Sequence, residues 1–147
     1  MKNTNLLVVG VGGQGTLLAS TVLAAVGIRA GFDVKKAEVH GMAQRGGSVS
    51  SHIRWGEKIY SPLIGKGEAD FMISLEKLES LRYMDMLRSG AISLVGDMRV
   101  SPLTVSSGSE VYPADDEIHG PAAEGKAGTG IDHFGNPGLW SLAAKGQ

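Results

Sequence analysis

The stretch Leu6-Leu7-Val8-Val9-Gly10-Val11-Gly12-Gly13-Gln14-Gly15 decides the fold class. Its leading apolar run is typical of a strand buried on both faces of a parallel sheet. The glycines mark a tight turn, after which residues 16–30 read as a helix that Gly31 ends. Residues 32–39 form the next strand. A strand–helix–strand unit of this length is a right-handed crossover, which predicts an α/β domain with a mixed, largely parallel sheet.

The next segment resembles a hairpin. Apolar and polar residues alternate over 49–55, as in a half-buried strand. Gly56-Glu57 then suits a two-residue turn, and residues 58–60 would form the returning strand. Pro62 ends that strand because it cannot donate to a ladder.

The remaining elements follow from apolar periodicity. Residues 69–75 are predicted to be a buried strand. Apolar residues recur every three positions from Leu75 to Leu87, which predicts a helix that Gly90 stops. Residues 91–95 are another strand, and residues 111–113 are the last expected piece of regular structure.

The first helix has an unusual lack of charge. No charged residue stands between Lys2 and Arg29, and Leu18, Val22, Ala25 and Val26 share one stripe. A surface helix normally presents a charged outer face, so this helix is covered on more than one side. It is either central to the domain's own core or, as we expect for so small a domain, buried against a partner subunit.

Composition bounds the function. A chain of 147 residues suits one domain, and a net charge of −1 gives no footprint for nucleic acid or anionic lipid. Because there is no cysteine, this chain has neither disulfides nor thiolate-bound clusters. Its four histidines lack metal-ligand spacing, so no metal site is expected. The first apolar run is too short for a signal peptide or membrane span, so a cytoplasmic location is expected.

The glycine turn carries a first functional hypothesis. Gly10, Gly12 and Gly15 match a dinucleotide fingerprint between a strand and a helix, and Glu38 lies near where a ribose-binding acid belongs. Backbone amides at a helix start favour a phosphate. The alternative is that these glycines only let the helix pack closely on the sheet.

The loop around residues 38–48 carries a second hypothesis. Arg45 offers planar donors for a carboxylate or phosphate, and the neighbouring glycines let the backbone approach a ligand. His40 is a group that titrates near neutral pH. The alternative is an ordinary surface turn with a solvated arginine.

Two motifs together resemble a known family. Gly10-Val11-Gly12-Gly13-Gln14-Gly15 and Glu38-Val39-His40-Gly41-Met42-Ala43-Gln44-Arg45-Gly46-Gly47-Ser48-Val49 are similar to the gamma-type subunit of 2-oxoacid:ferredoxin oxidoreductases, above all those specific for indolepyruvate. Tyr60-Ser61-Pro62-Leu63-Ile64 and Gly67-Glu68-Ala69-Asp70 extend the likeness over residues 5–117.

The resemblance implies a three-layer α/β/α domain. It also implies a complex in which other subunits bind thiamine diphosphate, Mg²⁺ and iron–sulfur clusters. That complex decarboxylates a 2-oxoacid oxidatively, passing the acyl group to coenzyme A and electrons to ferredoxin. The NAD hypothesis weakens accordingly, because the family is not known for that cofactor.

The family pattern divides the chain in two. Residues 1–117 would be the gamma-type α/β domain. Residues 118–147 depart from the pattern, as a truncated or frame-shifted C-terminus would. From His119 to Gln147 there are seven glycines and two prolines. We therefore expect no regular strand or docked helix in this tail.

Three functions follow as hypotheses. The first is a subunit of the oxidoreductase, inactive alone and carrying no cofactor of its own. The second is a stand-alone nucleotide-binding module, and the third is a purely structural assembly subunit. No catalytic residue is assigned. The expected ligand- or interface-binding residues are Gly10, Gly12, Gly13, Gln14, Gly15, Glu38, His40, Gly41, Met42, Gln44, Arg45, Gly46, Gly47 and Ser48.

Overall fold

The computed structural model describes residues 3–40, 46–101, 106–109, 111–114 and, for the backbone alone, 130–134. Its elements, in chain order, are β1 (Thr4–Val11), α1 (Thr16–Arg29), β2 (Asp33–His40), β3 (Ser48–Gly56), β4 (Ala69–Ser74), α2 (Lys77–Arg82), the 3₁₀ turn η1 (Met84–Met86), β5 (Leu87–Gly96) and β6 (Gly130–Phe134).

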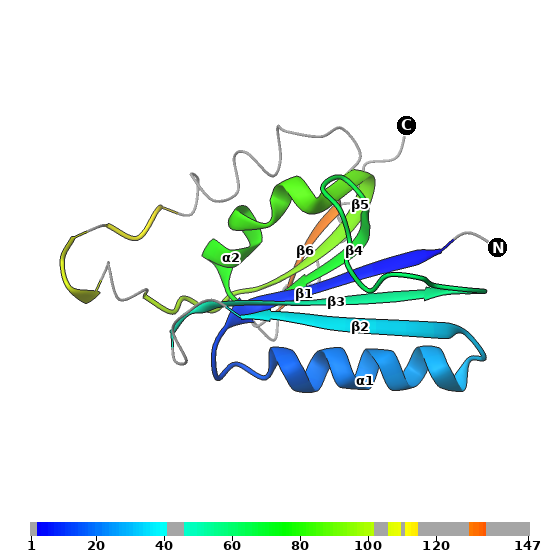
Figure 1. Cartoon of the computed structure of the whole chain (residues 1–147). Helices are drawn as coiled ribbons and strands as arrows, with labels where there is room; N and C mark the ends of the chain where they lie inside the picture. The colour runs from blue at the N-terminus through cyan, green and yellow to red at the C-terminus, as the bar shows by residue number, and fades with distance from the viewer. Residues whose placement is uncertain (1–2, 41–45, 102–105, 110, 115–129, 135–147) are drawn as a thin grey trace.

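One sheet of six strands in the order β2-β3-β1-β4-β5-β6 forms the middle layer. β3 runs antiparallel to β1 and β2, whereas β1, β4, β5 and β6 pair in parallel. α1 covers one face of the sheet and α2 the other (Figure 1). The expected three-layer α/β/α class with a mixed, largely parallel sheet is therefore confirmed.

The sheet separates two apolar clusters because neighbouring residues of β1 point to opposite faces. On the α2 face, Leu7 and Val9 pack with Met72, Leu87 and Ala91. On the α1 face, the buried residues Leu6, Val8 and Ile53 pack against partly buried side chains, which are Ala19, Leu23, Ala24, Val34, Trp55 and Ile73. β1 is thus covered on both sides, as its continuous apolar run predicts.

The predicted hairpin after Gly56 is wrong, because residues 57–68 contain no strand. β3 already pairs with β1 on one edge and β2 on the other, so a strand at 58–60 has no edge of β3 to join. Instead, the backbone N–H of Ile59 donates to Asp33 Oδ2 at 2.8 Å, which ties the segment to the start of β2.

The predicted helix over 75–87 is largely wrong. α2 has only six residues, and η1 follows it. Leu87 is the first residue of β5, pairs with Ala69 and is buried, so the last apolar residue of the helical pattern belongs to the sheet. Gly90, the expected stop, lies inside β5 with a φ of 74°. Residues 111–113 adopt no regular structure.

The expectation that the tail contains no strand is also wrong. β6 pairs in parallel with β5, from Ile92 opposite Gly130 to Gly96 opposite Phe134. β5 would otherwise leave its outer edge unpaired, and backbone pairing needs no apolar pattern in the added strand. The rest of the tail lies outside the described residues, and the division of the chain at residue 117 stays a prediction.

The apolar stripe of α1 points outward. Thr16, Ser20 and Gly27 are its buried residues, whereas Leu18 and Val22 are 70% and 53% exposed. The stripe of Leu18, Val22, Ala25 and Val26 is thus not the face that packs on the sheet. The face towards the sheet is made mostly of small residues, with Leu23 as its one large apolar side chain.

Candidate functional site

The chain leaves β1 and β4, two adjacent parallel strands, towards opposite faces of the sheet. α1 follows β1 on one face and α2 follows β4 on the other (Figure 1). In open α/β sheets, ligands bind outside the carboxyl ends of strands where the connections diverge in this way. We call this region the carboxyl crevice and define it by Gly12–Gly15, Gly46–Ser48 and Leu75–Glu76.

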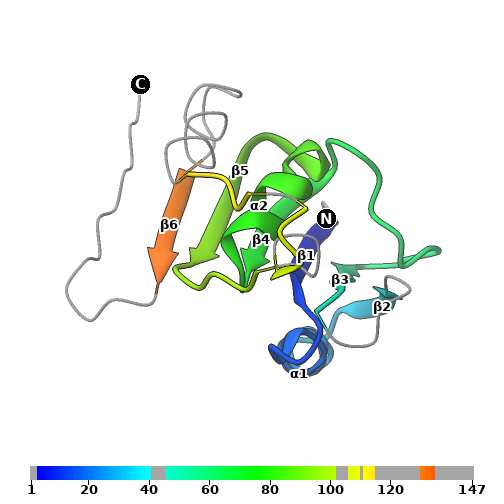
Figure 2. The same cartoon turned by 90° about the vertical axis from the view of Figure 1, so that its left-hand side faces the viewer.

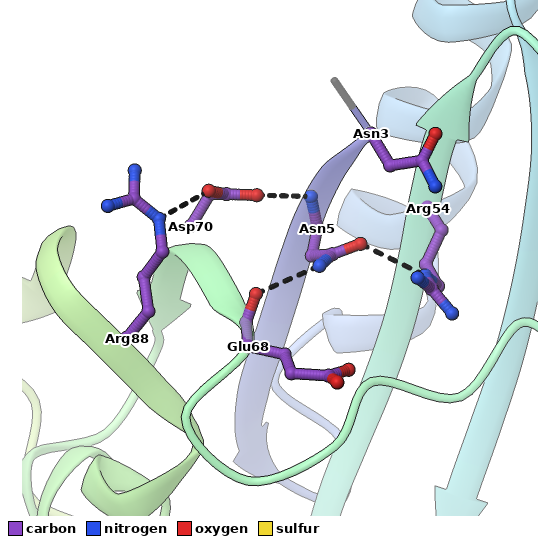
Figure 3. Close-up of a pocket in the computed structure, with 6 residues that line it drawn as sticks. All are labelled: Asn3, Asn5, Arg54, Glu68, Asp70 and Arg88. Carbon is purple, nitrogen blue, oxygen red and sulfur yellow. Dashed lines mark hydrogen bonds and ion pairs between the residues drawn. The ribbon is translucent and has the colours of Figure 1, made fainter. Parts of the chain in front are cut away.

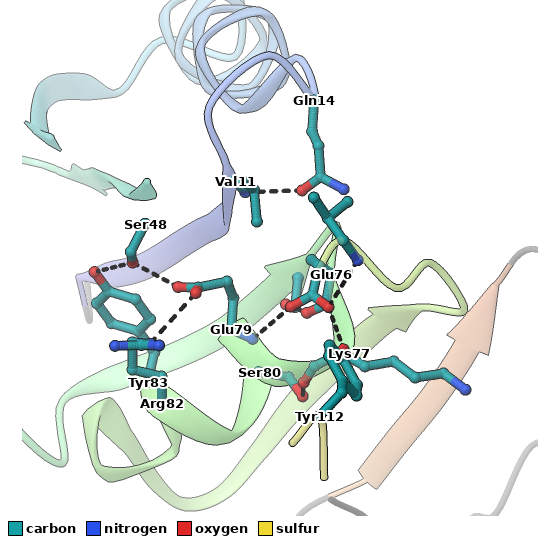
Figure 4. Close-up of polar contacts among 12 residues, drawn as sticks. Val11, Gln14, Ser48, Glu76, Lys77, Glu79, Ser80, Arg82, Tyr83 and Tyr112 are labelled. Atoms are coloured by element: carbon teal, nitrogen blue, oxygen red, sulfur yellow. Dashed lines mark hydrogen bonds and ion pairs between the residues drawn. The ribbon is translucent and has the colours of Figure 1, made fainter. Parts of the chain in front are cut away.

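Gln14 ties two parts of this region together. Its Oε1 accepts from the backbone N–H of Val11 at 2.8 Å (Figure 4). Its Nε2 donates to the Leu75 carbonyl at 3.3 Å. The side chain therefore turns inward and braces the glycine turn against the end of β4. Its observed role is structural.

Glycine is required at the individual positions of the turn for different physical reasons. A Cβ on Gly10 would lie 2.9 Å from both Gln14 Oε1 and Thr16 Oγ1, so this glycine permits close packing. Gly13 and Gly15 have φ values of 96° and 90°, which other residues rarely adopt. No side chain caps α1. The first-turn amides are thus not occupied by a cap, which is the condition for an anion to bind there.

The second sequence motif meets the first at a backbone hydrogen bond. Gly12 N donates to the Gly47 carbonyl at 2.9 Å. Ser48 opens β3 and pairs with Val11. The structure therefore brings Gly46, Gly47 and Ser48 next to the glycine turn.

Ser48 is joined to a carboxyl that sequence reasoning missed. Its hydroxyl donates to Glu79 Oε2 at 2.5 Å and lies 3.1 Å from the Tyr83 hydroxyl (Figure 4). Glu79 Oε1 also lies 3.3 Å from Arg82 Nε. Burial raises the pKa of Glu79, while the bond from Ser48 and the charge of Arg82 oppose that rise. Nothing in the helical pattern around residue 79 distinguishes this glutamate from a solvated one.

Glu38 and His40 lie elsewhere. Lys36 donates to Thr21 of α1 at 3.0 Å, and Glu38 pairs with Lys36 at 2.7 Å and with His40 at 3.5 Å. These side chains therefore stand on the α1 face. β3 also separates β2 from β1, so Glu38 is two strands away from the glycine turn. This arrangement differs from the dinucleotide fold, in which the strand with the ribose-binding acid adjoins the first strand.

Residues 41–45 of the second motif lie outside the described residues, and four of them are expected binding residues, namely Gly41, Met42, Gln44 and Arg45. Their assignment as binding residues stays a prediction.

Glu76, another residue that the sequence did not single out, organises the start of α2. Its carboxylate accepts from Glu79 N at 3.0 Å, from Val100 N at 3.3 Å and from the Tyr112 hydroxyl (Figure 4). Burial and the bond to Glu76 raise the pKa of Tyr112. Glu76 thereby caps the helix and fixes residues 100 and 112 beside it.

A cavity of about 320 Å³ lies at the opposite end of β1. Asp70 is central to its polar network, because its two oxygens accept from Asn5 N at 2.8 Å and Arg88 Nε at 2.5 Å (Figure 3). Arg54 Nε donates to Asn5 Oδ1 at 2.9 Å. These bonds join the starts of β1, β4 and β5 to the end of β3, which is a stabilising role.

Within the described ranges, no group of three histidine, aspartate or glutamate side chains is placed to hold a metal ion. No helix in the described part of the chain has the length and apolarity needed to cross a membrane.

Comparison with known proteins identifies the family. Residues 5–130 match the model of the pyruvate ferredoxin/flavodoxin oxidoreductase family. The proteins named indolepyruvate oxidoreductase subunit IorB from Thermococcus kodakarensis and Archaeoglobus fulgidus are 42% and 47% identical to this chain over 118 and 116 residues. Those alignments cover 80% and 79% of this chain and 58% and 57% of the relatives.

Solved structures share the fold. Subunit PORC of the Thermotoga maritima pyruvate oxidoreductase superposes with a TM-score of 0.60 at 19% identity, covering 91% of this chain and 62% of that one. The gamma subunit of a keto/oxoacid ferredoxin oxidoreductase from Geobacter sulfurreducens gives 0.55 at 20% identity, covering 89% and 60%.

The fold is that of an α/β domain of the kind found in these oxidoreductase subunits. The chain belongs to the pyruvate ferredoxin/flavodoxin oxidoreductase family. It spans somewhat more than half the length of the curated relatives that it matches.

Proposed function

We propose that this chain is a subunit of a 2-oxoacid:ferredoxin oxidoreductase complex that acts on indolepyruvate or another arylpyruvate. The observation that carries the proposal is the family match over residues 5–130, together with relatives named as indolepyruvate oxidoreductase subunits. The complex would oxidise and decarboxylate the 2-oxoacid, transfer the acyl group to coenzyme A and reduce ferredoxin.

In this proposal the cofactors belong to other subunits. The chain has no cysteine, so it offers no thiolate for an iron–sulfur cluster. Thiamine diphosphate, Mg²⁺ and the clusters would be held by partner chains. This chain contributes the carboxyl crevice, where the amides of the glycine turn and the loop containing Arg45 would face coenzyme A or the 2-oxoacid. A structure of a related 2-oxoglutarate:ferredoxin oxidoreductase from Magnetococcus marinus, which aligns with a TM-score of 0.57, contains 2-oxoglutarate, coenzyme A and succinyl-CoA.

The outer face of α1 supports a subunit role. We call this face the α1 patch, and its exposed apolar residues are Leu17, Leu18, Val22, Ala25, Val26 and Ile28. The hydrogen bond from Lys36 places Thr21 on the flank of α1 that is nearer β2. At 3.6 residues per turn, Val22 then lies on the outer side of the helix, and Val26 lies on the flank that faces away from β2. On the same face of the sheet, Phe71 and Ile92 are 40% and 44% exposed. In Figure 2, α1 lies under β1, β3 and β2 and away from β5. An uncharged apolar surface of this extent is typical of a subunit contact.

The observations support the other two functional hypotheses less well. The nucleotide-binding module depends on Glu38, which stands on the α1 face and is engaged with Lys36 and His40. The purely structural subunit leaves the uncapped start of α1 and the buried Glu79 without a role.

Co-purification tests the proposal. The full chain would be co-expressed with a candidate subunit that binds thiamine diphosphate and iron–sulfur clusters, and the purified material analysed for stoichiometry and cofactor content. We expect a complex in which iron and thiamine diphosphate remain with the partner after the chains are separated. A chain that never associates with such a partner, or that carries iron itself, would contradict the proposal.

A further inference from the structure

Two almost wholly buried glutamates, Glu76 at the N-cap of α2 and Glu79 in its first turn, lie in different surroundings. Glu76 is 1% exposed, and its three hydrogen bonds serve to cap the helix and hold residues 100 and 112. Glu79 is 4% exposed and points the other way, to Ser48 at the first residue of β3. The Glu76 carboxyl is thus engaged in bonds that hold the local structure, whereas the Glu79 carboxyl meets a side-chain hydroxyl.

The contact between Ser48 and Glu79 can run in two directions. A serine hydroxyl has a single hydrogen and can also accept. When Glu79 is ionised, that hydrogen is donated to its Oε2 at 2.5 Å. When Glu79 binds a proton, the carboxylic acid becomes the donor, and the Ser48 hydrogen is released towards another acceptor.

The position of Ser48 beside the glycine turn determines which other acceptor its hydrogen could reach. Ser48 directly follows Gly47, whose carbonyl accepts from Gly12 N of the glycine turn at 2.9 Å. Ser48 is half-buried, its hydroxyl contacts Glu79 and Tyr83, and its backbone pairs with Val11, the residue before the glycine turn. An acceptor in the crevice would therefore compete with Glu79 for one hydrogen.

We infer that Glu79 is a positioning residue of the carboxyl crevice, which by binding or releasing one proton sets whether Ser48 donates to a ligand there. The ligand presents a carboxylate or phosphate oxygen, as a 2-oxoacid and coenzyme A both do. The inference rests on the proposed function, because it takes the crevice as the place where one of these molecules binds.

The charged and titratable groups around Glu79 support a proton exchange at this site. Glu76 and Arg82 act on it from α2, and the Tyr83 hydroxyl reaches the same Ser48 oxygen. Burial is the largest influence and raises the pKa of Glu79 above the ordinary value of 4.5. Glu38 and His40 stand across the sheet on the α1 face.

The test uses the assembled complex with the full chain and measures KM for the 2-oxoacid and for coenzyme A separately as pH varies. In the wild type, KM for one of the two should rise as pH increases beyond 4.5 and Glu79 loses its proton, with kcat little changed. The substrate whose KM changes identifies the ligand. Glu79→Gln should abolish that pH dependence, because the amide stays neutral and can still donate to Ser48. Ser48→Ala should raise the same KM roughly tenfold at the low end of the pH range, where the wild-type hydroxyl is free to donate to the ligand. It should change KM little at the high end, where Ser48 already donates to Glu79.

Ser80→Ala is the matched control. Its hydroxyl is also buried on α2 but bonds to the Lys77 carbonyl at 2.6 Å, so the wild-type pH profile should remain. If the wild-type profile persists in Glu79→Gln, the inference is overturned while the proposed function stands. If the complex shows no turnover with any 2-oxoacid, the proposed function fails and the inference fails with it.

A second measurement is independent of turnover. Carbon-13 NMR of the glutamate carboxyls in the full chain should show Glu79 titrating above 4.5. Ser48→Ala should move the midpoint further up, because the bond from Ser48 favours the ionised form. A Glu79 midpoint at or below the ordinary value, or one that Ser48→Ala leaves unchanged, would overturn the inference.

Discussion

Gly27 of α1 lies directly against the indole of Trp55 on β3. A Cβ added to Gly27 would stand 2.6 Å from Trp55 Nε1 and 2.7 Å from its Cε2. Trp55 is held in place by stacking on Phe32, with ring centroids 6.0 Å apart and planes 12° from parallel. Because a bulky side chain fills the space beside it, α1 needs glycine here to pack on the sheet.

Gly27→Ala should therefore destabilise the chain despite alanine's better helix propensity. Overpacking a filled site costs about 1–3 kcal/mol, whereas the propensity gain is about 1 kcal/mol. Urea unfolding measures the difference. In a Trp55→Leu background the same substitution should cost less, and equal costs in the two backgrounds would contradict the packing account.

The α1 patch gives a second prediction. Val22→Lys should leave the free energy of unfolding of the lone chain unchanged within about 0.5 kcal/mol, because Val22 is exposed. It should abolish co-purification with the partner subunit, since a charge would be buried in an apolar contact.

Val111→Lys is the control for that substitution, because Val111 is 90% exposed and its neighbour Tyr112 bonds to Glu76 at the start of α2, on the other face of the sheet from α1 (Figure 1). It should retain the partner. Undiminished association of the Val22→Lys chain would show that the α1 patch is not the contact.

The polar network at the amino end of β1 is expected to matter for stability alone. Asp70→Asn should lower the free energy of unfolding by about 1–3 kcal/mol, because Asp70 is buried and the charge partner of Arg88 is lost. Asp85→Asn removes an exposed ion pair with Lys66, which solvent screens, and should cost much less. Equal losses measured by denaturant unfolding would refute this distinction.

Particular residues show what the sequence could predict. The run over 6–15 indicated both the buried strand and the turn into α1, because local sequence determines them. The start of β5 at Leu87 could not be read from the leucine spacing, since sheet pairing with Ala69 prevailed over helical periodicity. The place of β3 between β1 and β2 likewise depends on long-range pairing. Because of it, Glu38 on β2 does not lie next to the glycine turn.

The candidate site shows the same division. The glycines and Ser48 were singled out because their motifs are local. Glu79 was missed, because its importance arises only from its burial beside Ser48, which is 31 residues away in the chain.

Arg45, which lies outside the described residues, carries a prediction from the sequence alone. In the assembled complex, Arg45→Ala should weaken the substrate or acceptor step by about 1–3 kcal/mol, as the loss of a charge-assisted hydrogen bond would. Arg45→Lys should recover only part of the loss if both guanidinium donors are used. Steady-state kinetics for each substrate would check this, and unchanged values throughout would reduce Arg45 to a surface residue.

The proposed role as a subunit is tested by an assay of indolepyruvate oxidation in the presence of coenzyme A. The reduction of ferredoxin serves as the readout. The assay would be made with this chain alone, with the cofactor-bearing partner alone, and with both. We expect no turnover by this chain alone, and with both chains a rate that the partner alone does not reach. Turnover by this chain without any partner, or a rate of the partner that this chain leaves unchanged, would contradict the proposed role.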